Sequence, residues 1–114
     1  MKLNYVKIEQ ILDGLKDLIK IDLKVKTAFK IRKIIKKLNS EYDTFIEQRN
    51  EIIKKFELED GSIKNEEDKH KALEMISEIA FEKIEFEIEK LTEEELDCDH
   101  ITTEILMKID DILE

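Results

Sequence analysis

A helical spacing of apolar residues runs through the middle of this chain and leaves few alternatives to a long helix there. Steps of three and four residues join nine positions, which are Ala28, Ile31, Ile35, Leu38, Tyr42, Phe45, Arg49, Ile52 and Phe56. This spacing, which we call the seam, is typical of a helix that packs against its neighbours along one side. The sequence therefore predicts one helix over residues 27–57, with Leu38, Phe45 and Ile52 in the core.

Arg49 occupies a seam position at which an apolar residue is expected. In one interpretation, its aliphatic stem packs along the helix while the guanidinium reaches water. In another, it pairs with a glutamate of the third or last helix, or of a second copy of the chain, and so fixes the register of packing. The sequence leaves both interpretations open.

Three further helices are predicted around the long one. The first covers residues 4–19 and turns these apolar residues inward: Ile8, Ile11, Leu12, Leu15 and Leu18. An Asp60-Gly61 turn ends the long helix, and Asn65 caps a third helix over residues 65–83. The inward residues of this third helix are Leu73, Ile76, Ile79 and Ala80, and Ile84 is a further candidate. The last helix begins near Thr102, with its inward residues at Ile105, Leu106, Ile109, Ile112 and Leu113.

Two short stretches, residues 19–25 and 84–89, alternate apolar and charged residues, which is typical of half-buried strands. We favour a strand at residues 84–89 that pairs with residues 19–25, because this pairing sets lysines opposite glutamates. A helix through Ile84, Ile88 and Leu91 also fits the second stretch. After it, Thr92 and Glu95 have the spacing of a capping box, which opens a short helical turn.

These patterns predict a mainly α fold, in a single domain over residues 1–114. Its centre is a long antiparallel helical hairpin flanked by terminal helices, with at most one very small two-stranded sheet. A single Cys cannot form an internal disulfide, and no apolar run approaches the roughly 20 residues that cross a bilayer. The N-terminus also lacks the apolar core of a signal peptide. We therefore expect a cytoplasmic protein with no membrane partner.

Charge is divided unevenly along the chain, whose formal net charge is −9. Residues 1–38 carry 11 Lys or Arg and 4 Asp or Glu, a net charge of +7, whereas residues 39–114 carry 9 and 25, a net charge of −16. A basic stripe on the long helix, expected to be exposed, consists of Lys26, Lys30, Lys33 and Lys37. An acidic surface follows later in the chain and consists of Glu85, Glu87, Glu89, Glu93, Glu94, Glu95, Asp97 and Asp99. Either the two halves complement each other across helix contacts, or each offers a binding surface.

The sequence contains no convincing pattern of catalytic or metal-binding residues. The one local cluster of metal-capable side chains is Asp97, Cys98, Asp99 and His100. A structural zinc site needs four ligands, commonly in separated pairs, and the other histidine, His70, lies 30 residues away. Cys98 and His100 also lack a group to orient the base and donors for an oxyanion. We therefore expect no enzymatic activity, no metal and no cofactor.

Nucleic-acid binding through the basic stripe is not expected either. Seven of the residues from 24 to 37 are Lys or Arg, which is enough for contacts with phosphates. However, the rest of the chain repels polyanions, and Phe29 is the one aromatic side chain in this stretch on which a base could stack.

In the order of its segments, the chain resembles a group of small uncharacterised proteins encoded by tailed phages and prophages of low-GC Gram-positive bacteria. The segments that carry the resemblance are AFKIRKIIKKL (28–38), EQRNEIIKKF (47–56), EDGSIK (59–64), IEFEIEKLTEEEL (84–96) and ITTEILMKIDDIL (101–113). The chain is shorter than those proteins between the Asp60-Gly61 turn and the third helix. The resemblance implies a phage protein that acts in the host cytoplasm, and it brings no catalytic residues.

Two hypotheses of function follow, and both are non-enzymatic. In the first, the protein is a phage-encoded inhibitor of a host defence protein, for instance a CRISPR effector. The acidic surface of the inhibitor would occupy the basic nucleic-acid channel of that host protein. Residues 85–114 carry 12 Asp or Glu and 2 Lys, a net charge of −10, which suits a basic partner. In the second, it is an accessory or chaperone of phage assembly that oligomerises through the seam, for example as a homodimer.

Overall fold

The computed structural model describes residues 1–56, 66–96 and 100–114 of the chain. These residues form, in order, β1 (Lys2–Leu3), α1 (Tyr5–Leu18), α2 (Val25–Phe56), α3 (Glu66–Ala80), β2 (Ile84–Glu85), α4 (Thr103–Lys108) and the 3-10 helix η1 (Asp110–Ile112). The fold is mainly α with one tiny antiparallel sheet, which confirms the predicted class. The turn predicted at Asp60-Gly61 and the cap predicted at Asn65 lie outside the described residues.

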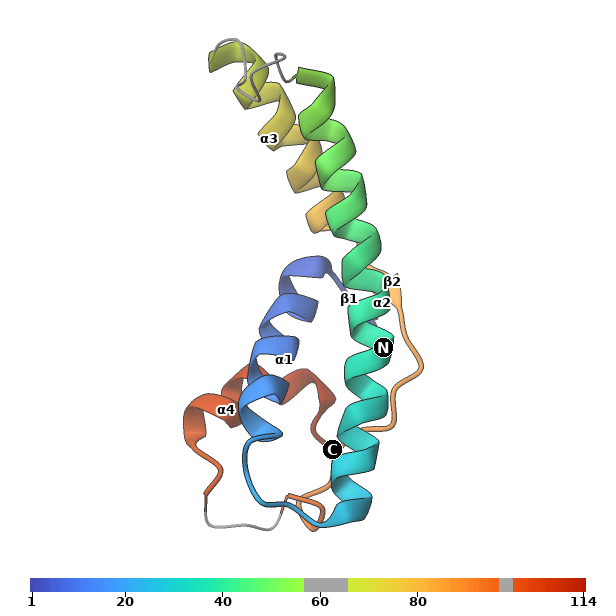
Figure 1. Cartoon of the computed structure of the whole chain (residues 1–114), viewed down its shortest axis with the longest axis vertical. Helices are drawn as coiled ribbons and strands as arrows, with labels where there is room; N and C mark the ends of the chain where they lie inside the picture. The colour runs from blue at the N-terminus through green and yellow to red at the C-terminus, as the bar shows by residue number, and fades with distance from the viewer. Residues whose placement is uncertain (57–65, 97–99) are drawn as a thin grey trace.

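The molecule is elongated, with extents of 53 × 26 × 21 Å, because α2 runs along most of its length (Figure 1). The 32 residues of α2 span about 48 Å at about 1.5 Å per residue. Beside its N-terminal half, α1 and α4 pack into what we call the base. Beside its C-terminal half runs α3, and these two helices project from the base as what we call the arm.

The main hydrophobic core lies in the base and is built from segments far apart in the sequence. Its fully buried side chains come from α1, α2, η1 and the chain beside them: Ile8, Ile11, Leu15, Leu18, Ile31, Leu38, Leu91, Ile109 and Ile112. The inward face predicted for the first helix is confirmed, and Asn4 caps that helix by accepting a hydrogen bond from the Lys7 backbone N–H at 2.8 Å.

The seam prediction is confirmed at Leu38, Phe45 and Ile52, which are all buried against other helices of the same chain. It is wrong at Ala28, which is exposed, because the buried positions in the first turns of α2 are Thr27, Ile31 and Ile34. A straight helix has 3.6 residues per turn and drifts by about 20° per heptad from a strict 3.5-residue repeat. At the N-terminal end of α2, the buried face therefore includes Thr27 and Ile34, each one residue before a seam position, while Ile31 belongs to both the seam and the buried face.

In the arm, two helices cover only part of each other's apolar residues. Ile52 of α2 and Ala72 of α3 are buried, but Leu73 is 64% exposed, so its predicted inward position is wrong. Successive helical residues point about 100° apart, which places Leu73 at the edge of the face that Ala72 turns toward α2. The third helix ends at Ala80, before the predicted residue 83, and Ile84 belongs to the sheet.

The sheet forms at one of the predicted strands, but only Ile84–Glu85 of the predicted residues 84–89 are strand, and the partner differs. Strand β2 pairs antiparallel with β1, so that Leu3 is opposite Ile84 and Lys2 is opposite Glu85. The predicted pairing with residues 19–25 is wrong, because residues 19–21 continue α1 as a tight turn. In that turn the Lys20 and Ile21 N–H groups donate to carbonyls of α1 at 3.2 and 3.1 Å, so the backbone is not free to join a sheet.

Residues 84–96, which we call the connecting segment, lead from the sheet toward α4 and include the predicted capping box. The Thr92 N–H donates to Glu95 Oε1 at 3.0 Å, and the Glu95 N–H donates to Thr92 Oγ1 at 3.2 Å, which confirms that prediction. Leu91 pairs with Leu113 in a parallel bridge, because the Leu91 N–H donates to the Ile112 carbonyl at 2.8 Å and the Glu114 N–H donates to the Leu91 carbonyl at 2.9 Å.

Helix α4 begins at the predicted cap, where Thr102 Oγ1 accepts from the Ile105 N–H at 3.2 Å. It approaches α1 so closely at Gly14 that an added Cβ would lie 2.7 Å from Ile109 Cγ2 and 2.8 Å from Lys108 Cβ. Ile105 and Ile109 are buried as predicted, along with Ile112 of η1. Leu106 and Leu113, also predicted to face inward, pack against the core but are only half-buried.

Candidate protein-binding surface

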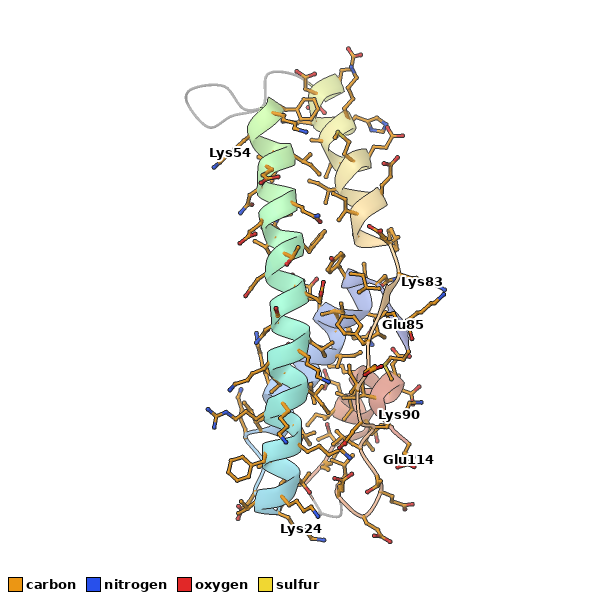
Figure 2. All side chains as sticks on the ribbon, turned by 90° about the vertical axis from the view of Figure 1, so that its right-hand side faces the viewer. Lys24, Lys54, Lys83, Glu85, Lys90 and Glu114 are labelled. Carbon is orange, nitrogen blue, oxygen red and sulfur yellow. The ribbon has the colours of Figure 1, made fainter. Side chains whose placement is uncertain are left out.

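The predicted acidic surface follows the connecting segment, which runs beside α2 through the labelled residues Glu85 and Lys90 (Figure 2). Its exposed members are Glu85, Glu87, Glu89, Glu93 and Glu94. Asp97 and Asp99 lie outside the described residues. Glu95 is the exception, because its side chain is only 24% exposed and faces the long helix.

Glu95 is committed to holding the connecting segment in place. Besides its two capping-box hydrogen bonds, its Oε1 atom accepts a hydrogen bond from Lys30 Nζ at 2.7 Å. This lysine lowers the pKa of the Glu95 carboxyl, and the Thr92 backbone N–H adds to the effect. Because these groups already bind the Glu95 carboxylate, it is less available for contact with a second protein.

Two lysines of the basic stripe serve the same internal purpose. Lys30 Nζ also donates to the Lys90 carbonyl at 2.7 Å, and Lys37 Nζ donates to the Glu87 carbonyl at 2.7 Å. The expectation of an exposed stripe is therefore wrong at Lys30, whose side chain is only 20% exposed, whereas the other members are exposed, namely Lys26, Lys33 and Lys37. At these contacts the positive and negative parts of the chain complement each other within one molecule.

The remaining acidic residues differ in what lies beside them. Glu85 forms an ion pair with the N-terminal amine at 3.1 Å. Glu89 shares a small hollow of about 150 Å³ with Lys30, Lys33 and Lys37, and Glu94 shares one of about 320 Å³ with Lys24 and Lys26. Glu93 instead lies at a hollow in which no described lysine or arginine takes part.

That hollow is one half of an apolar groove formed by the turn at residues 93–96 and the last elements of the chain. It has a volume of about 360 Å³ and is lined by Glu93, Leu96, Ile101, Leu106, Leu113 and Glu114. A second hollow of about 400 Å³ shares Leu106 and Leu113 with it and adds Thr103, Met107 and Asp110. We call the two together the C-terminal groove. Sequence reasoning missed it, although the adjacent Leu106 and Met107 beside the inward Ile105 are the signal that could have revealed it.

A larger hollow, of about 630 Å³, lies between α1 and α2 but has no consistent character. Acidic, basic and neutral polar side chains all line it, among them Glu9, Asp13, Lys16 and Asn39. Such a mixture does not select one class of ligand, so we do not assign it a binding role.

Arg49, the polar residue of the seam, lies near the junction of base and arm. Its Nε atom is buried and makes no hydrogen bond within the described structure. Its charge opposes the rise in pKa that burial produces at the Tyr42 hydroxyl, so the two side chains are close. Within the described residues, Arg49 therefore has an aromatic neighbour on α2 and forms no ion pair with a glutamate of another helix.

The residues considered for metal binding or catalysis are largely not placed. Asp97, Cys98 and Asp99 lie outside the described residues, and His100 is exposed. Across residues 1–56, 66–96 and 100–114, no three His, Cys, Asp or Glu side chains form a group that could hold a metal ion. In the same residues, every helix is too short or too polar to cross a membrane.

No protein-family model matches the sequence, and the searches of curated proteins and of solved structures likewise return no match.

Proposed function

We propose that the protein is a non-enzymatic, phage-encoded protein-binding module that inhibits a host defence protein by covering one of its basic surfaces. The phage origin rests on the resemblance of its sequence segments. The binding role rests on the exposed carboxylates of Glu87, Glu89, Glu93 and Glu94, none of which forms an ion pair within the described part of the chain. A basic nucleic-acid channel, such as that of a CRISPR effector, is the partner surface that these charges fit best.

The charge distribution supports this proposal because the acids that fold the chain are separate from those that face solvent. Glu95 and Lys30, which donates a hydrogen bond to it, stabilise the connecting segment, whereas Glu93 and Glu94 of the same turn remain exposed. Crowded like charges repel one another and contribute little to folding. A partner with a basic cleft would relieve that repulsion, and its association rate would fall as the salt concentration rises.

The test is made in a low-GC Gram-positive host with active CRISPR interference against a phage. Expression of the protein should raise the plating efficiency of that phage. The double variant Glu93→Lys/Glu94→Lys should lose this effect, while Glu74→Lys/Glu78→Lys, which reverses two exposed acids of the arm, should retain it. If the two variants raise the plating efficiency equally, the acidic surface is not required for inhibition. If the native protein does not raise the plating efficiency, the protein does not inhibit that effector.

A role in phage assembly is a second candidate, favoured by the arm rather than by the seam. The seam residues Ile31, Leu38 and Phe45 are buried in the core of their own chain, so an oligomer could use them only by opening the fold. The arm, however, carries Leu73 at 64% exposure and ends beside Phe81 at 63% exposure. Sedimentation velocity over a range of protein concentrations tests this candidate. Self-association that Leu73→Lys abolishes would favour a role in assembly, whereas a protein that stays monomeric at every concentration would contradict assembly through an oligomer.

A further inference from the structure

The C-terminal groove is an apolar surface that the described residues of the chain leave open beside α4. Ile105 and Ile109 turn one side of this helix toward α1, where Gly14 allows the close approach. Leu106 and Met107 follow at about 100° and 200° around the helix from Ile105 and so lie toward the other side. Met107 is 69% exposed, whereas Leu96 on the opposite wall is 9% exposed. The groove therefore has one buried apolar wall and one exposed apolar edge.

The walls of the groove are held in place by contacts already described. The capping box fixes the turn that carries Glu93 and Leu96. The backbone bridge between Leu91 and Leu113 fixes the opposite wall. A groove with fixed walls requires little ordering when a ligand binds, which favours affinity. Each of the two hollows, at about 360 and 400 Å³, is also within the roughly 300–1,000 Å³ typical of ligand sites.

The charges around the groove identify the kind of occupant that fits. Glu93, Glu114 and Asp110 lie among its lining residues, and no described lysine or arginine does. The hollows beside the basic stripe differ, because lysines line both of them. A lipid surface or a nucleic acid would bring negative charge to these acids. A second copy of the chain, docking through the same face, would bring the same acids together.

We propose that the C-terminal groove binds a segment of a partner protein that carries neighbouring apolar side chains flanked by Lys or Arg. The apolar side chains enter the two hollows around Leu106 and Leu113, and the flanking cations face Glu93 and Asp110. This inference deepens the proposed function and rests on it, since Glu93 belongs to the acidic surface. It adds that binding needs apolar anchors as well as charge.

Three synthetic peptides of about 14 residues, long enough for marginal helix formation in water, provide the test. The first combines Leu and Lys at helical spacing, the second replaces each Lys by Glu, and the third replaces each Leu by Ser. Methyl and amide resonances of the protein are followed by NMR during titration with each peptide. The Leu/Lys peptide should shift the methyl resonances of Ile101, Leu106 and Leu113, and the other two should leave those methyl resonances unchanged.

The peptides separate failure of this inference from failure of the proposed function. If both lysine peptides shift only the backbone amides of residues 87–94, the acidic surface binds basic segments without the groove, and the inference is overturned while the proposed function stands. If neither lysine peptide shifts any resonance, both are overturned. If the Leu/Glu peptide shifts the groove methyl resonances as strongly as the Leu/Lys peptide, the acidic rim does not select the occupant, and the inference is again overturned.

Variants of exposed residues test whether the peptide binds in the C-terminal groove rather than elsewhere along the acidic surface. Glu93→Lys/Asp110→Lys, which reverses two charges of the groove, should weaken Leu/Lys peptide binding by about tenfold. Glu87→Lys/Glu89→Lys, which reverses two exposed acids outside the groove, should change the affinity by no more than about twofold. Met107→Ser should weaken binding without loss of thermal stability, because this side chain is 69% exposed. Equal weakening by the two charge-reversal pairs, or no effect of Met107→Ser, would contradict binding in the groove.

Discussion

Replacing Gly14 by alanine should destabilise the protein, although the same change stabilises most helices. An alanine Cβ would lie 2.7 Å from Ile109 Cγ2 and 2.8 Å from Lys108 Cβ, so α1 and α4 would have to separate. Overpacking of this kind costs roughly 1–3 kcal/mol, and the higher helix propensity of alanine offsets about 1 kcal/mol. Ile109 is fully buried and its Cγ2 is fixed to the β-carbon, so we expect the upper part of the range to apply. The net loss is then about 1–2 kcal/mol.

Urea denaturation followed by circular dichroism measures this loss, and a thermal scan should show a midpoint lower by about 4–8 °C. A double-mutant cycle with Ile109→Leu identifies the cause, because leucine lacks the branch that carries Cγ2. The penalty of Gly14→Ala should be smaller in that background, although the Lys108 contact remains. A Gly14→Ala protein that is more stable than the native one by about 1 kcal/mol would refute the close approach of α1 and α4.

Other predictions test the core, the connecting segment and the absence of nucleic-acid binding. Leu38→Ala and Phe45→Ala should each cost about 2–5 kcal/mol in chemical denaturation, and Ile52→Ala should cost less because it lies in the two-helix arm. The pKa of Glu95 is lowered from its ordinary value of 4.5, so its stabilising effect is present above pH 4.5 and is lost as the pH falls through the folded-state pKa. Glu95→Gln should therefore lower the urea midpoint at neutral pH, and this difference should shrink in acid. In mobility-shift assays at about 0.15 M salt, the protein should form no complex with DNA or RNA, because its net charge is −9 and the stripe lysine Lys30 is held internally. A complex that is lost when the stripe lysines become glutamine would overturn this expectation.

The long helix was predictable because its signal repeats many times. Each seam residue adds to the same period, so one wrong position, Ala28, does not change the helix that the pattern indicates. Which residue of each turn is buried depends on the neighbouring helices, and the period of the seam does not specify how these pack. Thr27 and Ile34 are buried because α2 drifts relative to the regular repeat, and that drift depends on the packing of the whole base.

The sheet and the groove were harder to predict because their signals are short. Strand β1 has two residues, too few for any alternation to be recognised, so residues 19–25 were the more visible partner for β2. The groove depends on Leu106 lying outside the α1 contact, and a six-residue helix gives little information on which of its apolar residues face inward. Residue types alone identified the acidic surface, but they did not separate Glu95, which is held by Lys30, from its exposed neighbour Glu94.

The pairing of both chain ends with the connecting segment has a consequence for the order of folding. The Phe86 N–H donates to the Met1 carbonyl and the Leu91 N–H donates to the Ile112 carbonyl, so the first of these contacts closes a loop of about 85 residues. The arm, like the contact of α1 with α2, joins helices that are neighbours in the sequence and needs only local contacts. Long-range contacts form slowly because loop closure costs entropy before any packing compensates for it. We therefore expect the hairpin of α2 and α3 to form early and the base to close last. On the ribosome, that closure waits until residues 112–114 have emerged.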